Sequence, residues 1–185
     1  MTLTLKDWQA RAAALKPDTR LFIDGAFVDA AKGGKFETVN PATGEVVAEV
    51  ARGTAEDVDR AVASARKAFR SGVWSRMAPS DRMAVMRRFA DLIEAHAEDF
   101  ALLDTLDMGK PISDMLNIDI PGSLMTIRFF AETIDKMEGV VTSTKADALH
   151  YILRQPLGVC GIVVPWNYPL MMAAWKLAPA LSCGN

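Results

Sequence analysis

The sequence predicts an α/β protein in which β-hairpins and long helices lead into the first strand and helix of a doubly wound parallel sheet. Two observations predict this class. The first fifty residues carry short apolar runs separated by turn residues, whereas apolar residues recur at helical spacing from Thr54 onward. Near the end, the apolar run 159–164 stops at Pro165, and Pro169 is well placed to begin a helix. Open α/β sheets bind ligands where a strand ends in this way.

The composition is that of a globular protein with small-molecule or protein partners. The 185 residues are half hydrophobic, and 21 basic against 23 acidic residues give a formal net charge of −2. Because lysines and arginines form no block, we expect no nucleic-acid or anionic-membrane surface. Cys160 and Cys183 cannot build a disulfide framework, which favours a cytoplasmic location. Three prolines interrupt the apolar stretch 156–183, so we expect no membrane span.

The N-terminal part is predicted to be mostly β. Its first fifteen residues suggest a short amphipathic helix rather than a signal peptide. Asp24-Gly25 then lies between two apolar runs, and such a pair strongly favours a two-residue hairpin turn because both residues tolerate positive φ. Residues 36–39 and 46–50 predict two further strands on either side of an Asn-Pro-Ala-Thr-Gly turn.

Three helices are predicted in the middle of the chain. Asp57 follows Thr54 by three residues, as in a capping box, and an apolar helical pattern continues from there to a glycine. A second helix is predicted over residues 79–103. A third is predicted over residues 113–137, in which Pro121 removes a backbone hydrogen bond and should kink or split the helix.

The last third of the chain predicts a ribbon followed by a buried βα unit. Residues 140–144 and 149–154 alternate in polarity, which indicates a two-stranded ribbon whose free edges a partner would cover. Residues 159–164 are apolar on both faces, as in a strand buried between helices. Residues 170–177 are apolar nearly all round, which predicts a buried helix.

Three groups of motifs occur in order along the chain. They are Thr38-Val-Asn-Pro-Ala-Thr-Gly44, Leu106-Asp-Met-Gly-Lys-Pro111, and Pro156-Leu-Gly-Val with Pro165-Trp-Asn-Tyr-Pro169 and Trp175-Lys-Leu-Ala-Pro-Ala180. Together they resemble the N-terminal part of an NAD(P)-dependent aldehyde dehydrogenase. Within that family, Trp8-Gln9, Arg20-Leu-Phe-Ile-Asp-Gly25 and Asp119-Ile-Pro-Gly122 are most similar to the γ-glutamyl-γ-aminobutyraldehyde dehydrogenases of putrescine degradation.

The resemblance implies the N-terminal part of the aldehyde dehydrogenase fold. Residues 1–138 would form hairpins and helices that pack on the cofactor domain, and residues 139–155 would form an oligomerisation ribbon. Residues 156–185 would begin a Rossmann-like NAD-binding domain, so that the chain is truncated and the catalytic domain is absent. The family also implies a homo-oligomer, either a dimer or a tetramer.

The reaction that the resemblance implies oxidises a small aldehyde to a carboxylate. A cysteine attacks the aldehyde, the nicotinamide of NAD or NADP accepts a hydride, and water activated by a glutamate hydrolyses the thioester. Asn167, carried over from Pro-Trp-Asn, would donate its side-chain amide to the oxyanion of the first intermediate. Local physics alone favours a different role, because an asparagine just before Pro169 can cap the helix that begins there.

Further site residues follow from the same resemblance. Residues at the end of the expected strand would line the cofactor, three side chains of the next helix would line the aldehyde tunnel, and two strand residues with an aspartate would hold a monovalent cation. These sets are Val163, Val164, Pro165 and Trp166 for the cofactor, Tyr168, Met172 and Trp175 for the substrate, and Thr38, Val39 and Asp107 for the cation. The alternative for the substrate set is plain core packing, because its spacing puts it on one helix face.

The resemblance also has departures that bear on activity. Neither Cys160 nor Cys183 matches the family's nucleophile, and both are expected to be inert apolar cysteines. The glutamate and the glycine-rich cofactor turn have no match either, so the NAD(P) site would be incomplete and the chain inactive alone. A second hypothesis is a non-catalytic protein that pairs with full-length subunits through the 139–155 ribbon. A third is an α/β protein with an unrelated ligand.

Overall fold

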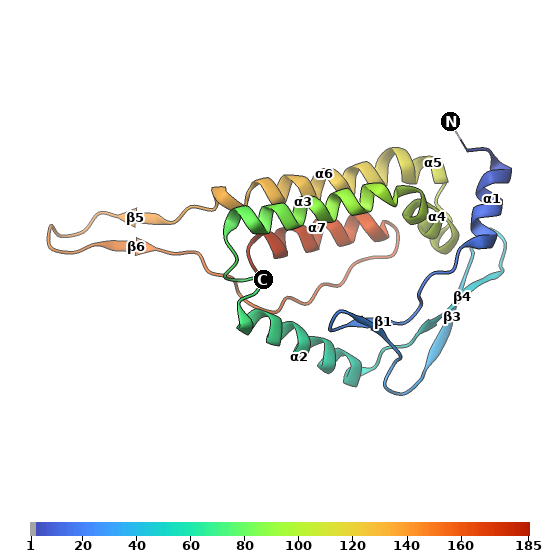
Figure 1. Cartoon of the computed structure of the whole chain (residues 1–185), viewed down its shortest axis with the longest axis horizontal. Coiled ribbons are helices and arrows are strands. Elements are labelled where there is room, and N and C mark those ends of the chain that lie inside the picture. Colours follow the sequence, from blue (N-terminus) through green and yellow to red (C-terminus); the bar gives the residue numbers. More distant parts are fainter. Residues whose placement is uncertain (1–2) are drawn as a thin grey trace. The chain divides into compact units, whose positions relative to one another are not determined.

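The computed structural model describes residues 3–185 (Figure 1). The chain divides into two compact units, each discontinuous in sequence. Unit 1 contains the residues up to Ala65 together with His96–Ile120, and unit 2 contains Arg66–Ala95 together with Pro121–Asn185. The strands pair into three separate two-stranded antiparallel sheets.

The two hairpins of unit 1 confirm the strands predicted there. Strands β1 (Leu21–Ile23) and β2 (Ala26–Val28) are joined by Asp24 and Gly25, whose φ angles of 54° and 76° both lie in the left-handed region. This geometry is what a two-residue hairpin turn requires. Strands β3 (Lys35–Val39) and β4 (Val46–Ala51) form the longer hairpin, and their register shifts between Thr38 and Val39.

Unit 1 contains the first part of helix α2 (Ala55–Ser71) and three shorter helices. The shorter helices are α1 (Leu5–Ala14), α4 (Ala97–Met108) and α5 (Ile112–Asp114), the last of which runs into a π-helical turn over Met115–Asp119. Helix α1 has a capping box of Thr4 and Asp7, and none of its residues is fully buried. An ion pair of 2.5 Å between Arg11 and Glu98 ties it to α4.

Helix α2 (Ala55–Ser71) begins at the predicted capping pair. The Asp57 carboxylate accepts hydrogen bonds from the Thr54 backbone N–H and the Ala31 N–H, both at 2.9 Å. These bonds lower the pKa of the Asp57 carboxyl below its ordinary value. One carboxylate therefore both caps α2 and fixes the loop that precedes β3.

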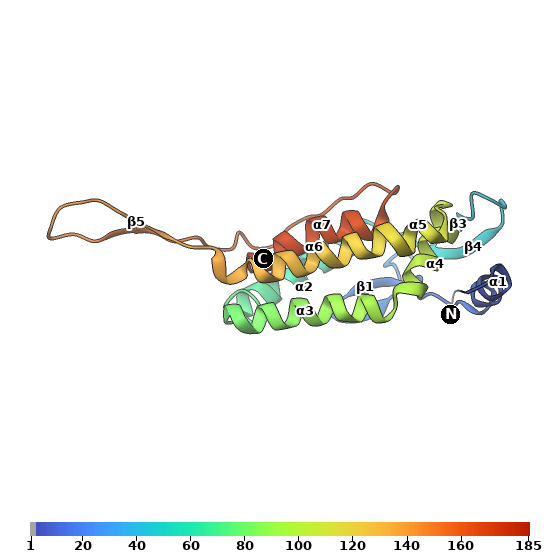
Figure 2. The same cartoon turned by 90° about the horizontal axis from the view of Figure 1, so that it is seen from above.

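Three helices of unit 2 run side by side, α3 (Pro79–Ala95), α6 (Ile120–Glu132) and α7 (Pro169–Ser182) (Figures 1 and 2). Ion pairs from Arg128 to Asp91 and Glu94 join α6 to α3. The helices bury one shared set of side chains, namely Met86, Ala90, Ile93, Leu124, Ile127, Ala131, Met171, Ala174 and Ala178. This core fixes α7, the helix that follows Pro165-Trp-Asn-Tyr.

Two of the predicted helices are interrupted. The helix expected over 79–103 divides at His96, whose φ of −111° and ψ of 22° lie outside the helical region. The helix expected over 113–137 divides as predicted, because a π-helical turn precedes Pro121 and a 3₁₀ turn (Ile134–Lys136) follows α6. A wider turn can accommodate the missing backbone N–H of the proline.

The ribbon in unit 2 is confirmed, but the buried strand after it is not formed. Strands β5 (Val140–Thr142) and β6 (His150–Ile152) extend from the helices of their unit (Figures 1 and 2). Residues 159–164 pair with no strand among the described residues, and Val163 is 96% exposed. A β-strand satisfies its backbone only through a neighbouring strand, and the part of the chain described here places none beside this segment.

Candidate functional site

Asn167 lies between the exposed segment 159–166 and helix α7. Pro169 is the first residue of α7, and its fixed φ suits that position. The capping residue is Tyr168, and no side chain caps the helix, so the alternative role of Asn167 as a cap is wrong. Asn167 is exposed, and no hydrogen bond to its amide is present within residues 3–185. The donor of this amide is therefore available to a ligand.

The predicted substrate residues share the side of α7 that its own core leaves open. Met171 and Ala174 are buried against the bundle, whereas Trp175 is 46% exposed and Tyr168 is 37% exposed. Met172 is half-buried between them in sequence. Helix α7 packs closely on α6 through Met171, because a Cβ added to Gly122 of α6 would lie 3.2 Å from the Met171 side chain. The aromatic pair is therefore packed on one side and accessible on the other.

The predicted cofactor residues are accessible. Trp166 is 79% exposed and Val164 is 36% exposed, next to the almost fully exposed Val163. Pro165 separates them and has no backbone N–H to satisfy. Exposed backbone with one flat aromatic ring fits contact with a ribose and a nicotinamide, so the residues present are compatible with the cofactor.

The predicted cation residues lie in unit 1, where the structure brings two of them together. The Thr38 hydroxyl of β3 donates a hydrogen bond to Oδ1 of Asp107, in the last turn of α4. Val39, the third residue, follows Thr38 directly at the register shift and is 43% exposed. No cluster of three or more histidine, cysteine, aspartate or glutamate side chains that could hold a metal ion occurs in residues 3–185.

Both cysteines differ from the expected inert, apolar type in being exposed. Cys160 lies in the irregular segment, where its thiol is 3.8 Å from the Gly158 carbonyl oxygen. Cys183 follows α7, and its sulfur is 3.6 Å from the sulfur of Met137. Cys160 is exposed because helices do not cover the segment 159–164.

Sequence reasoning missed Arg82, the buried cation of unit 2. It is 8% exposed and lies on the inner face of α3, four residues before Met86 and eight before Ala90. This spacing is the signal that could have identified it, because residues at i and i+4 share a helix face. The side chain lines a cavity that was not predicted.

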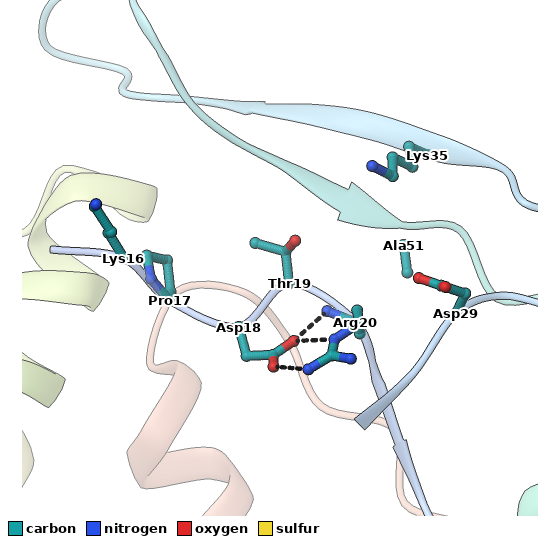
Figure 3. Close-up of a pocket in the computed structure, with 8 residues that line it drawn as sticks. All are labelled: Lys16, Pro17, Asp18, Thr19, Arg20, Asp29, Lys35 and Ala51. Atoms are coloured by element: carbon teal, nitrogen blue, oxygen red, sulfur yellow. Dashed lines mark hydrogen bonds and ion pairs between the residues drawn. The ribbon is translucent and has the colours of Figure 1, made fainter. Parts of the chain in front are cut away.

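A smaller polar pocket of about 410 Å³ lies in unit 1 (Figure 3). Its most ordered feature is the ion pair between Arg20 and Asp18, with Nη2 and Oδ2 separated by 2.5 Å. Hydrogen bonds from Arg20 lower the pKa of the Asp18 carboxyl below its usual range. The aspartate thus neutralises this arginine, while Lys16, Lys35 and Asp29 also line the pocket.

No helix in residues 3–185 is long and apolar enough to cross a membrane. The sequence model described as the aldehyde dehydrogenase family matches residues 27–185. The chain is 49% identical over 178 residues to the NADP/NAD-dependent aldehyde dehydrogenase PuuC of Escherichia coli, covering 96% of this chain and 36% of that protein. It is 46% identical over 182 residues to an aminoacetaldehyde dehydrogenase of Pseudomonas aeruginosa, covering 98% and 37%.

Solved structures of similarly named enzymes superpose closely on this chain. An indole-3-acetaldehyde dehydrogenase from P. syringae, in complex with NAD+ and IAA, superposes with a TM-score of 0.98 at 53% identity, covering 100% of this chain and 37% of that one. A γ-glutamyl-γ-aminobutyraldehyde dehydrogenase from Burkholderia cenocepacia superposes with a TM-score of 0.97 at 48% identity, covering 99% and 37%. The chain spans about a third of the length of the curated relatives described above.

Proposed function

The chain belongs to the aldehyde dehydrogenase family, and on this premise we propose that it supplies one wall of a site that oxidises an aldehyde to a carboxylate with NAD or NADP. Residues 156–185 would begin the Rossmann-like cofactor domain, residues 1–138 would pack on it, and residues 139–155 would form the oligomerisation ribbon. The observation that carries the proposal is the exposed Asn167 amide, which has no hydrogen-bond partner in residues 3–185 and lies at the start of a helix whose core face is fixed.

Asn167 would donate its side-chain N–H to the oxyanion that forms when a nucleophile attacks the aldehyde carbonyl. An amide that needs no rearrangement before it donates stabilises developing charge effectively, and such a donor is typically worth about 10²–10³-fold in rate. Tyr168, Met172 and Trp175 would orient the aldehyde from the open side of α7. Their large apolar surfaces would also exclude water from the reacting carbon.

NAD or NADP, when bound, accepts the hydride. Val163 and Val164 would offer backbone groups to it, and Pro165 with the ring of Trp166 would form the adjoining wall. Support comes from the exposure of these residues and from the NAD+ held by a relative that superposes over the whole chain. The cytoplasm is the location that we propose for this chemistry.

The 185 residues by themselves are proposed not to turn over aldehyde. In the family resemblance neither Cys160 nor Cys183 is the nucleophile, and an oxyanion donor without its nucleophile has nothing to stabilise. Incubating the purified chain with NAD and a short aldehyde should give no NADH absorbance. Sustained NADH formation that follows the protein concentration would contradict this proposal.

The role of Asn167 can be tested in an enzyme that carries these residues at its amino end. Replacing Asn167 with alanine should lower kcat by about 10²–10³-fold, because the lost donor acts on the transition state rather than on substrate binding. Asn117→Ala is the matched control, since that amide only donates to the Ser113 carbonyl at 2.7 Å. Equal rates for both variants would refute the assignment.

The substrate that we propose is a γ-glutamyl-γ-aminobutyraldehyde type of aldehyde, as in putrescine degradation. Support comes from the B. cenocepacia structure of that name and from the motifs that surround Asp119-Ile-Pro-Gly122. Relatives named for indole-3-acetaldehyde match at similar identity, so the two aldehydes should be compared in the same assay. A lower kcat/KM for the γ-glutamyl substrate would count against the proposal.

Thr38, Val39 and Asp107 are proposed to hold a monovalent cation. The hydroxyl and carboxylate oxygens already lie together, and a cation bound to both oxygens would turn the hydroxyl hydrogen away from the carboxylate. Sodium or potassium chloride should raise the melting temperature above that in choline chloride, and Asp107→Asn should remove the difference. No difference in the unaltered chain would disprove the site.

A second candidate function, favoured by the ribbon, is pairing with complete subunits without catalysis. Val141, Leu149 and Leu153 are 71%, 75% and 64% exposed, which is unusual for large apolar side chains unless a partner covers them. A homo-oligomer, a dimer or a tetramer, would use the same surface. Co-expression with a full-length relative followed by size exclusion should give a mixed assembly; elution as a lone monomer would exclude this function.

A further inference from the structure

A cavity of about 940 Å³ lies within unit 2 and is here called the Arg82 cavity. Four segments line it: residues 75–82 leading into α3, residues 134–138 after α6, residues 154–157 after the ribbon, and the end of the chain around Cys183. Its size is within the range of sites that hold small molecules in proteins. None of the residues assigned above to aldehyde or cofactor lines it.

Arg82 is the buried polar group of this cavity. Its Nη1 donates a long hydrogen bond of 3.4 Å to the Met77 carbonyl, and its Cζ lies 6.0 Å from the centre of the Trp74 ring. Its Nε–H is buried and has no hydrogen-bond partner within residues 3–185. Burial also lowers the pKa of the guanidinium. A buried charged donor without an acceptor is costly, and an oxyanion would satisfy it.

The charge of the surrounding side chains also favours an anion. Arg76, Lys136 and Arg154 line the cavity beside Arg82, whereas Glu138 is the one acidic side chain among the described residues that line it. Arg154 Nε donates to the Glu138 backbone carbonyl at 3.3 Å, which leaves the rest of its guanidinium for a ligand. Clustered cations with one carboxylate create a positive potential inside the cavity.

The rest of the wall is mixed: Ser75, Gln155 and Asn185 are polar, and another part is apolar. Met77, Met137 and Leu157 line the apolar part, and Leu157 is 94% exposed, so its side chain is not used in the core of the unit. Apolar surface of this kind contributes binding free energy only if the ligand carries its own apolar part. A simple inorganic ion would leave this wall in contact with water.

We propose that the Arg82 cavity binds an organic carboxylate, with the carboxylate on the guanidinium of Arg82 and a short alkyl chain on Met77, Met137 and Leu157. The planar guanidinium can hold a carboxylate through N–H···O bonds from those of its nitrogens that reach the cavity. Arg154 and Lys136 add long-range attraction. The guanidinium of Arg82 would thus recognise the carboxylate of the ligand, and the apolar part of the wall would recognise its alkyl chain.

The test uses NMR titration of the 185-residue chain with hexanoate, acetate, inorganic phosphate and 1-hexanol. The reporter is the Trp74 indole N–H, which donates to the Leu181 carbonyl at 3.1 Å beside Arg82 and is assigned with Trp74→Phe. Hexanoate should shift this signal at concentrations at least tenfold lower than acetate, because each buried methylene adds roughly fourfold in affinity. Equal affinity for phosphate and hexanoate would mean an adventitious ion only and would overturn the proposal.

Variants separate the carboxylate contact from general charge. Arg82→Gln should weaken hexanoate binding by at least tenfold, whereas Arg88→Gln, an exposed arginine on the same helix outside the cavity, should not change it. Leu157→Asp tests the apolar wall without risk to the core, because Leu157 is almost fully exposed. Unchanged binding in Leu157→Asp, or 1-hexanol binding as tightly as hexanoate, would overturn the proposal.

Discussion

Lys110 and Asp119 form the most buried ion pair found in residues 3–185. Lys110 Nζ lies 2.7 Å from both carboxylate oxygens, and the two side chains are 13% and 1% exposed. The lysine comes from the Leu106–Pro111 motif, and the aspartate ends the π-helical turn. A pair so poorly solvated has lost its hydration, so either charge alone would be strongly unfavourable.

Replacing Lys110 with methionine should therefore lower the free energy of unfolding by about 3–5 kcal/mol, because Asp119 would remain buried without its cation. Urea denaturation followed by circular dichroism measures this. Lys32→Met, at an exposed lysine, is the control and should stay within about 0.5 kcal/mol of the unaltered chain. The double replacement Lys110→Met with Asp119→Leu should recover most of the loss; a double variant as unstable as the single one would contradict the argument.

At the scale of elements, the end of α4 depends on one glycine. Gly109 has a φ of 79° and its N–H bonds to the Thr105 carbonyl, which closes the helix in the left-handed conformation. A Cβ at this position would lie 2.8 Å from Cγ of Pro41, in the turn after β3. The same residue thus ends a helix and permits close approach of a hairpin.

Gly109→Ala should destabilise the chain more than Gly44→Ala does. Both glycines have a φ near 75–79°, so both substitutions carry the backbone strain of about 1–2 kcal/mol, but a Cβ on Gly44 has no neighbour within 4 Å. The difference in unfolding free energy between the variants isolates the contact with Pro41. Equal losses would show that the proline moves away without resistance.

Local signals predicted elements whose conformation a few neighbouring residues decide. Asp24-Gly25 correctly predicted a hairpin turn, and Pro121 correctly predicted the division of the helix around it. The break at His96 has no local signal, since Ala95 and Ala97 both favour helix. Helices α3 and α4 belong to different compact units, and tertiary packing overrides propensity there.

The candidate site could be predicted only in part. Asn167 and Trp166 are proposed site residues because of their motif, and the structure shows both exposed, but the exposure of Val163 was not predictable from an apolar run. Such a run predicts that burial is favourable, not that a covering element is present. Arg82 was missed because only apolar residues were considered as candidates for the buried face of this helix.

For the molecule as a whole, exposed apolar surface is the dominant feature. Leu157, Val163 and Trp166 are 94%, 96% and 79% exposed in one short segment, and the ribbon adds Val141 at 71%. Patches of this kind mark interaction sites or a tendency to aggregate. Association of one copy of the chain with another should therefore be favourable, even if each copy is stably folded.

We expect the purified chain to self-associate at micromolar concentrations. Val163→Lys and Val141→Lys place a charge in the segment and in the ribbon respectively, and each should raise the dissociation constant if its surface is used. Val85→Lys, at a 48% exposed position of α3, is the control. Analytical ultracentrifugation measures the effect, and a monomeric unaltered chain over the whole concentration range would refute the expectation.

The ribbon β5–β6 buries none of its residues in its own unit. Core packing therefore places little constraint on its sequence. If the ribbon pairs with a partner as proposed, recognition and folding are encoded in separate stretches that can diverge at different rates. Exchanging residues 140–152 for those of a relative should leave the unfolding free energy unaltered while redirecting the choice of partner.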